Sequence, residues 1–167
     1  MHRKFTAFAL AAALAGSTQA APKGVSRDEV VFGIHTALSG PVASWGVGSV
    51  NGIRMRFDEV NQNGGVHGRR LRLVVEDNQY QVPLAVQAAN KLINRDRIFA
   101  MLGALGTPMN NAVLPRLIEK GIPNLLPYTA ARSMAHPLHP LKFAATSTYY
   151  DHNRVGTKYA VETLGAD

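Results

Sequence analysis

Hydroxyl and aromatic side chains that follow apolar runs are the residues of this sequence best suited to bind a small molecule. Thr107 follows one such run, directly after Gly106. Its hydroxyl and the amides of Met109 and Asn110 could converge on an anion at the N-terminus of a helix. Trp45 is the only tryptophan, and its side chain offers a flat apolar face and one N–H donor. These residue types indicate binding of an anion with an apolar body.

Each of these residues also has a purely structural interpretation. Thr107 could cap its own helix and do nothing else, and Trp45 could pack into the core against the following helix. Tyr128, Thr129 and Ala130 follow a later apolar run and offer two hydroxyls, but such a segment could equally be a solvated turn. Residue type alone leaves both interpretations open.

The sequence offers only poor matches to the motifs of catalysis, metal binding or dinucleotide binding. His136 and His139 form the only close histidine pair, but Pro137 prevents a helical pairing and no acidic or cysteine ligand lies nearby. The glycines of residues 46–52, taken with Asp77, match a dinucleotide fingerprint only superficially, because the preceding turn is too long. No G-x-S-x-G motif and no cysteine occurs. We therefore expect no enzymatic activity, no metal and no cofactor.

Basic residues outnumber acidic residues by 18 to 11, which gives a formal charge of +7. Such a charge weakly favours anionic partners at long range. The dense basic group is Arg69, Arg70 and Arg72, but a nucleic-acid site normally adds interleaved aromatic residues. We expect no nucleic-acid partner.

Residues 1–20 are typical of an export signal. A basic start, an apolar run over residues 5–15 and a small-residue end predict cleavage after Ala20. The alternative is a short N-terminal membrane anchor, although the run is only about half of a bilayer span. We expect a periplasmic location, with no cysteine available for lipid attachment or disulfides.

Strand and helix patterns alternate from residue 30 onward. Apolar or alternating runs predict strands at residues 30–38, 70–77, 98–103, 122–126 and 143–146. Apolar spacing and flanking glycine or proline predict helices at residues 48–61, 83–96, 107–120 and 151–164. Pro115 is expected to kink the third helix. The order predicts an α/β fold with a doubly wound parallel sheet.

Ligands of such sheets bind beyond the carboxyl ends of the strands. The segments that directly follow the predicted strands are therefore the candidate site. They are residues 39–45, 77–80, 103–107 and 128–130, which bring Ser39 and Leu105 into the candidate set.

Several motifs in this order resemble the periplasmic binding proteins for branched-chain amino acids, the substrate-binding subunits of ABC importers. They are Ala37-Leu38-Ser39-Gly40-Pro41, Asn61 to Gly65 followed by Gly68, Glu76-Asp77, and Gly121-Ile122-Pro123. The resemblance covers about residues 30–164 and implies a fold of two lobes that close on a ligand like a hinge. It also implies a membrane permease as partner.

The resemblance implies a role for each candidate residue. Thr107 would hold the ligand carboxylate, Tyr128, Thr129 and Ala130 would hold the head group, and Trp45 would line the side-chain pocket. Tyr128, Ala130 and the proline after Thr107 depart from the pattern of the amino acid binders. An aromatic or aliphatic carboxylate, or an amide, would therefore suit the site about as well as an amino acid.

The domain organisation follows from the same resemblance. We expect a signal peptide at residues 1–20, an incomplete N-terminal ligand-binding lobe at residues 21–146, and the first helix of a second lobe at residues 147–167. Family members are longer, so the resemblance implies a truncated chain. The predicted function is delivery of a small solute to an ABC importer, and the alternative is a ligand-sensing receptor domain on the same fold.

Overall fold

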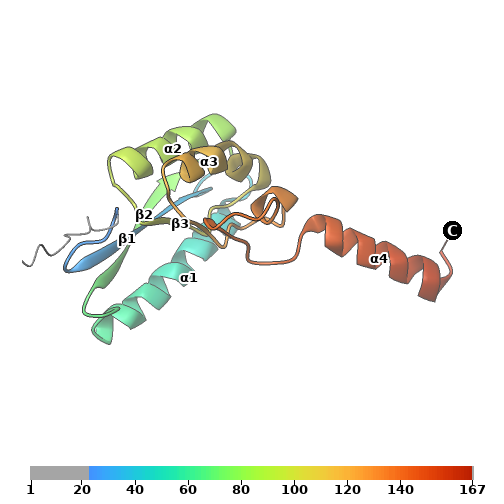
Figure 1. The fold of residues 1–167 in the computed structure, drawn as a ribbon, viewed down its shortest axis with the longest axis horizontal. Helices are drawn as coiled ribbons and strands as arrows, with labels where there is room; N and C mark the ends of the chain where they lie inside the picture. Colours follow the sequence, from blue (N-terminus) through green and yellow to red (C-terminus); the bar gives the residue numbers. More distant parts are fainter. Residues whose placement is uncertain (1–22, 167) are drawn as a thin grey trace, which may run out of the picture.

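The computed structural model describes residues 23–166, so the predicted signal segment lies outside the described residues. Strands and helices alternate through this part of the chain (Figure 1). The elements are β1 (Glu29–Thr36), α1 (Ala43–Gln62), β2 (Arg70–Asp77), α2 (Val82–Asn94), β3 (Ala100–Leu102), α3 (Thr107–Glu119), β4 (Asn124–Leu125), the 3-10 helix η1 (Arg132–Met134), β5 (Lys142–Phe143) and α4 (Tyr149–Leu164).

The strands form one parallel sheet in the order β2-β1-β3-β4-β5. β1 lies between β2 and β3 and pairs along its whole length with β2, from Glu29 opposite Arg70 to Thr36 opposite Asp77. Figure 1 shows α2 and α3 over one face of the sheet and α1 on the other. The predicted α/β fold with a doubly wound parallel sheet is therefore confirmed.

The main core lies between the sheet and the pair α2 and α3. Ala85, Ala89 and Leu92 of α2 are buried, as the apolar spacing predicts, and pack with Met101 and Leu117. Burying each large apolar side chain stabilises the fold by about 1.5–3 kcal/mol. On the other face, the Phe57 ring of α1 lies 5.3 Å from the Phe32 ring of β1.

Helix α1 begins at Ala43, earlier than the predicted start at residue 48. Its first turn includes Trp45, which the sequence interpretation placed in a loop. Gly46 makes this start possible, because a Cβ there would overlap the carbonyl oxygen of Ala37. The glycine lets the helix approach the end of β1 closely and so brings Trp45 to the strand ends.

Helix α3 begins at Thr107 as predicted, but the residue at its N-cap is Gly106 with φ 99°. Thr107 is the first helical residue, and no side chain caps this helix. The interpretation of Thr107 as a self-capping residue is therefore wrong. Pro115 lies within the helix, which continues to Glu119.

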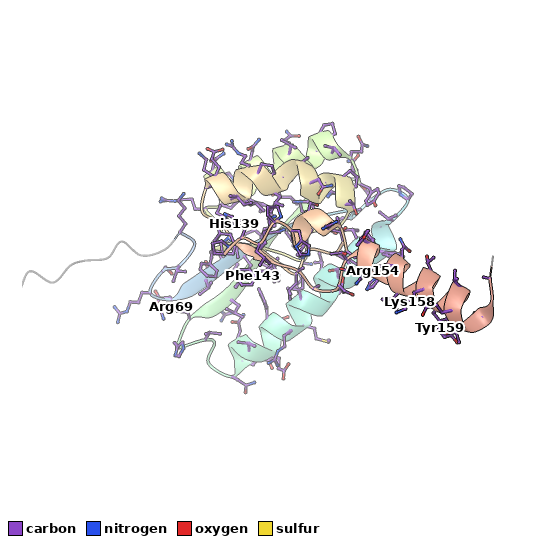
Figure 2. All side chains as sticks on the ribbon, turned by 45° about the vertical axis from the view of Figure 1, so that its right-hand side comes forward. Arg69, His139, Phe143, Arg154, Lys158 and Tyr159 are labelled. Carbon is purple, nitrogen blue, oxygen red and sulfur yellow. The ribbon has the colours of Figure 1, made fainter. Side chains whose placement is uncertain are left out.

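Helix α4 projects away from the sheet, as Figure 1 shows, and none of its described residues is buried. Figure 2 shows Arg154, Lys158 and Tyr159 on this projecting helix. The Thr148 hydroxyl caps it by accepting a hydrogen bond from the amide of Asp151 at 3.2 Å. Within residues 23–166, no helix has the length and apolar character needed to cross a membrane.

Candidate ligand-binding site

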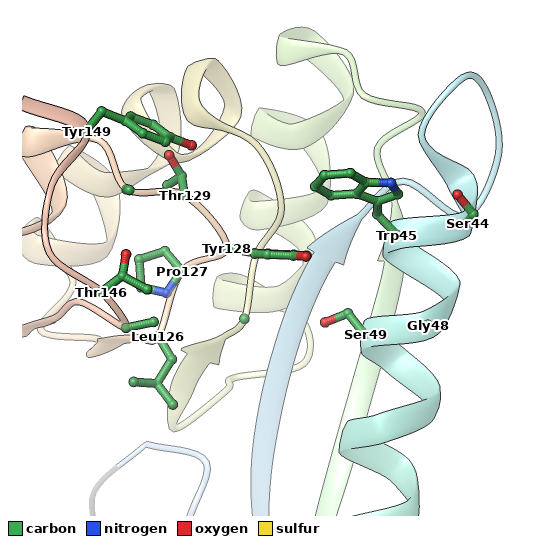
Figure 3. Close-up of a pocket in the computed structure, with 13 residues that line it drawn as sticks. Ser44, Trp45, Gly48, Ser49, Leu126, Pro127, Tyr128, Thr129, Thr146 and Tyr149 are labelled. Atoms are coloured by element: carbon green, nitrogen blue, oxygen red, sulfur yellow. The ribbon is translucent and has the colours of Figure 1, made fainter. Parts of the chain in front are cut away.

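A cavity of about 660 Å³ lies at the carboxyl ends of the strands (Figure 3). Its walls come from the first turns of α1, the segments that follow β3, β4 and β5, and the start of α4. They comprise Ser44, Trp45, Gly48, Ser49, Gly103, Leu126, Pro127, Tyr128, Thr129, Ala130, Ala145, Thr146 and Tyr149. The cavity occupies the edge of the sheet where the strand order predicts ligand binding.

A smaller cavity of about 210 Å³ lies beside the first and shares three aromatic walls with it, namely Trp45, Tyr128 and Tyr149. Its other walls are Val42, Tyr80, Leu105, Gly106 and Thr107. The two cavities together bring six of the seven predicted site residues to one rim. The exception is Ser39.

Trp45 and Tyr128 stack on each other at this rim. Their ring centroids are 5.8 Å apart and their planes meet at 28°. Trp45 is 60% exposed and Tyr128 is 49% exposed. Trp45 is therefore not a core residue, and both rings keep apolar surface free to contact a ligand.

Thr107 and Thr129 form the polar part of the rim. Their hydroxyl oxygens are 2.5 Å apart, and the Thr129 hydroxyl also accepts a hydrogen bond from the amide of Ala131 at 3.2 Å. Thr129 is buried, so it does not belong to a solvated turn. One of the two hydroxyls donates to the other, so only one hydroxyl proton of the pair can be directed to another acceptor.

Tyr149 is a site residue that the sequence interpretation missed. Its amide donates to the carbonyl of Ala130 at 2.8 Å, and Figure 3 shows its hydroxyl directed toward Thr129. A backbone hydrogen bond from Ala130, together with side-chain hydrogen bonds from Thr129 and Thr107, holds the pKa of Tyr149 below its ordinary value. Tyr149 therefore adds a third hydroxyl group to the polar part of the rim.

Ser39 holds the loop after β1 and lines neither cavity. Its hydroxyl donates to Oδ2 of Asp77 at 2.6 Å, and Oδ1 accepts from the amides of Leu38 and Gln79, each at 2.9 Å. Burial raises the pKa of Asp77, but the bonds from Ser39, Gln79 and Leu38 outweigh burial and leave the pKa lowered. The carboxylate therefore acts as a loop anchor.

Two details of the predicted anion site differ from expectation. The amide of Asn110 donates to the carbonyl of Gly106 at 3.0 Å, so it is used within α3 and is not free for a ligand. Leu105 is buried at 5% exposure and lines only the smaller cavity. It forms an isolated parallel bridge with Tyr128, which keeps the two loops in register.

A buried histidine contacts the residue that positions Tyr80 in the smaller cavity. His35 is fully buried, and its Nδ1 lies 3.1 Å from the side-chain nitrogen of Asn78. Asn78 Oδ1 accepts a hydrogen bond from the amide of Tyr80 at 2.8 Å, which fixes the backbone of a cavity residue. Burial lowers the pKa of His35 to about 4, so the imidazole is neutral near pH 7.

The other motifs considered above take structural roles. Gly46, Gly48 and Gly52 all lie inside α1, so they do not form a phosphate-binding turn. His139 accepts a hydrogen bond from the amide of Leu141 at 3.2 Å. Between residues 23 and 166, no group of three or more potential metal ligands comes together.

Known proteins match most of this chain. A family model described as periplasmic binding protein matches residues 29–167. A leucine-specific-binding protein of Salmonella typhimurium is 37% identical over 86 residues, which are 52% of this chain and 23% of that protein. The Leu/Ile/Val-binding protein BraC3 of Rhizobium johnstonii is 30% identical over 122 residues, 73% of this chain and 32% of that protein.

A solved structure agrees with the fold. A fatty acid ABC transporter substrate-binding protein from Thermomonospora curvata has a TM-score of 0.73 at 28% identity, over 86% of this chain and 36% of that chain. The chain belongs to the periplasmic binding protein family, as its motifs indicate. It spans between 23% and 32% of the length of the two curated relatives described above.

Proposed function

We propose that this chain provides a ligand-binding lobe of a solute-binding protein, and that it binds a small carboxylate at the carboxyl ends of its strands. The observation that carries the proposal is the shared rim of two cavities, where Thr107, Thr129 and Ala130 adjoin exposed aromatic walls. The carboxylate would accept hydrogen bonds from the hydroxyls and from the Ala130 amide. The apolar remainder of the ligand would lie against Trp45 and Tyr128.

Relatives support a transport role for the whole protein. Named relatives are leucine-specific and Leu/Ile/Val-binding proteins, and a similar structure is the substrate-binding protein of an ABC transporter. We propose that this protein likewise passes its solute to a membrane permease of an ABC importer, outside the cytoplasm. We propose a binding role without turnover, since these relatives carry the names of binding proteins.

The lobe boundary belongs to the same proposal. Residues 23–146 hold the sheet, its covering helices and every wall of the two cavities except Tyr149. Helix α4 contributes Tyr149 to the rim but has no buried residue. We propose that residues 147–167 belong to a second lobe, which would approach the exposed side of the site and cover the ligand.

Substitution Thr107→Val tests the proposed carboxylate role, because valine keeps the shape of threonine and removes the hydroxyl. Calorimetric titration with leucine, isovalerate, benzoate and benzamide would measure affinity. We expect about tenfold weaker binding of the carboxylate that binds best, since one hydrogen bond to a charged group contributes about 1.5–3 kcal/mol.

A matched control is Thr157→Val, which removes an exposed hydroxyl from a residue of α4 that lines neither cavity. Its affinity should equal that of the unmodified chain. Unchanged carboxylate affinity in Thr107→Val, with both variants folded by circular dichroism, would exclude Thr107 from ligand binding.

A further inference from the structure

Four aromatic side chains gather around the two cavities at the strand ends. They come from α1, the segment after β2, the segment after β4 and the start of α4: Trp45, Tyr80, Tyr128 and Tyr149. Their exposed fractions are 60%, 39%, 49% and 51%. Large apolar side chains that remain exposed together around a hollow mark a binding surface.

The ring geometry suits a flat ligand. Trp45 and Tyr128 are nearly parallel, with planes 28° apart, so together they present a stacked aromatic wall. Figure 3 shows this wall facing the cavity across from Tyr149 and Thr129. Aromatic rings attract one another through offset stacking and edge contacts beyond simple area burial. A planar aromatic group would therefore gain more here than a saturated group of equal size.

The described lining of the two cavities is uncharged. None of the described residues that line either cavity carries a formal charge. Asp77, an acidic residue of the adjoining loop, already accepts hydrogen bonds from Ser39, Leu38 and Gln79. The polar groups that these walls offer to a ligand are therefore neutral.

The polar groups of the rim suit a carboxylate. The hydroxyls of Thr107 and Thr129 lie together at the rim, and Figure 3 shows the Tyr149 hydroxyl directed toward Thr129. A carboxylate accepts hydrogen bonds from such hydroxyl groups strongly. A cavity of about 660 Å³ is within the usual size of small-molecule sites.

From these observations we infer that the ligand is an aromatic monocarboxylate, of the benzoate or phenylacetate type. This inference rests on the proposed function and narrows it. The carboxylate binds the hydroxyl cluster of Thr107, Thr129 and Tyr149, and the ring lies against the stacked wall of Trp45 and Tyr128.

Trp45 itself provides the measurement, because it is the only tryptophan of the 167-residue chain. A ligand that lies against its ring must change its fluorescence. Titration of the full chain would use benzoate, phenylacetate, cyclohexanecarboxylate, benzamide, leucine and glycine betaine. We expect saturable changes with benzoate or phenylacetate at concentrations at least tenfold below those needed for each of the other probes.

Variants can distinguish the contribution of ring contacts to affinity from the contribution of other contacts with the ligand. Tyr128→Leu keeps Trp45 as reporter and removes one ring of the wall. We expect it to weaken binding of the aromatic acid about tenfold while binding of cyclohexanecarboxylate changes less than twofold. Met55→Ala is the matched control, since Met55 is 74% exposed on α1 and lines neither cavity. Circular dichroism would verify that each variant is folded.

The possible outcomes distinguish a failure of this inference from a failure of the proposed function. Leucine or cyclohexanecarboxylate binding as tightly as benzoate would overturn the aromatic assignment and leave the proposed function intact. Equal binding of benzamide would overturn the carboxylate requirement, and preference for glycine betaine would show that the rings bind a cation instead. Absence of binding by every probe to a folded chain would overturn both.

Discussion

Neutral hydroxyl groups, rather than charged side chains, form the polar rim of the candidate site. Thr107, Thr129 and Tyr149 lie on three segments that are far apart in the sequence and meet at the strand ends. Removing a neutral hydrogen-bond donor from water costs less free energy than removing a charged group. The rim can therefore remain partly covered by aromatic rings without an unpaired buried charge.

His35 predicts a loss of stability in acid. Its folded-state pKa of about 4 lies below the ordinary value of 6.5, so the unfolded chain binds a proton more readily between these pH values. The stability contributed by neutral His35 is fully present above about pH 6.5 and falls as the pH drops toward 4. The loss reaches about 3 kcal/mol, measurable by urea unfolding at a series of pH values.

Substitution His35→Gln isolates this effect, because glutamine still offers an acceptor to Asn78 and cannot bind a proton. The variant should lose less stability than the unmodified chain between pH 6.5 and 4. His67→Asn, which replaces a histidine at an exposed position, is the control variant. A profile unaltered by His35→Gln would contradict the assignment.

At the scale of the element, the contact between α1 and β1 depends on one glycine. Gly46→Ala places a methyl group on the Ala37 carbonyl, which forces the helix away from the strand. We expect destabilisation of about 1–3 kcal/mol, measured by urea unfolding. Gly52→Ala on the same helix meets no atom within 4 Å and should stabilise the chain by roughly 0.5–1 kcal/mol. Equal effects at both positions would contradict this close contact.

Helix α4 should open far more readily than α2. It has no buried residue among those described, whereas α2 buries five, and isolated helices of about this length are marginal in water. Hydrogen exchange followed by mass spectrometry should therefore show rapid exchange in α4 and slow exchange in α2. Comparable protection of the two helices would mean that α4 has a partner surface in this chain.

The sequence predicts the elements with strong periodicity and misses boundaries that depend on tertiary contact. The bounds of β2 and the inward residues of α2 agree with prediction because alternation and helical spacing are clear there. The start of α1 was missed because Val42 gives no side-chain cap. Only the contact of Gly46 with Ala37 explains why the helix extends past Trp45.

The candidate site was predictable where it follows a clear strand. Six of the seven residues adjoin the cavities because the parallel order brings strand ends together. Tyr149 was missed because β5 has only two residues, Lys142 and Phe143, and its end is hard to place from sequence. Ser39 has the expected position, but its bond to Asp77 directs it away from the rim.

At the scale of the whole molecule, the described residues form one sheet with helices on both faces and one helix that extends beyond it (Figure 1). The exposed side of α4 carries apolar residues, which include Tyr150, Val155 and Tyr159. The side chain of Arg132 lies 5.2 Å from the Tyr150 ring, which connects the helix to η1. Assignment of this helix to a second lobe stays a prediction.

The stacked pair of Trp45 and Tyr128 joins two distant parts of the chain across the sheet. A contact between residues so far apart in the sequence requires a long loop of backbone to close before it can form. A chain in which either segment is unfolded therefore lacks the aromatic wall. Refolding followed by tryptophan emission would report the formation of the binding surface itself.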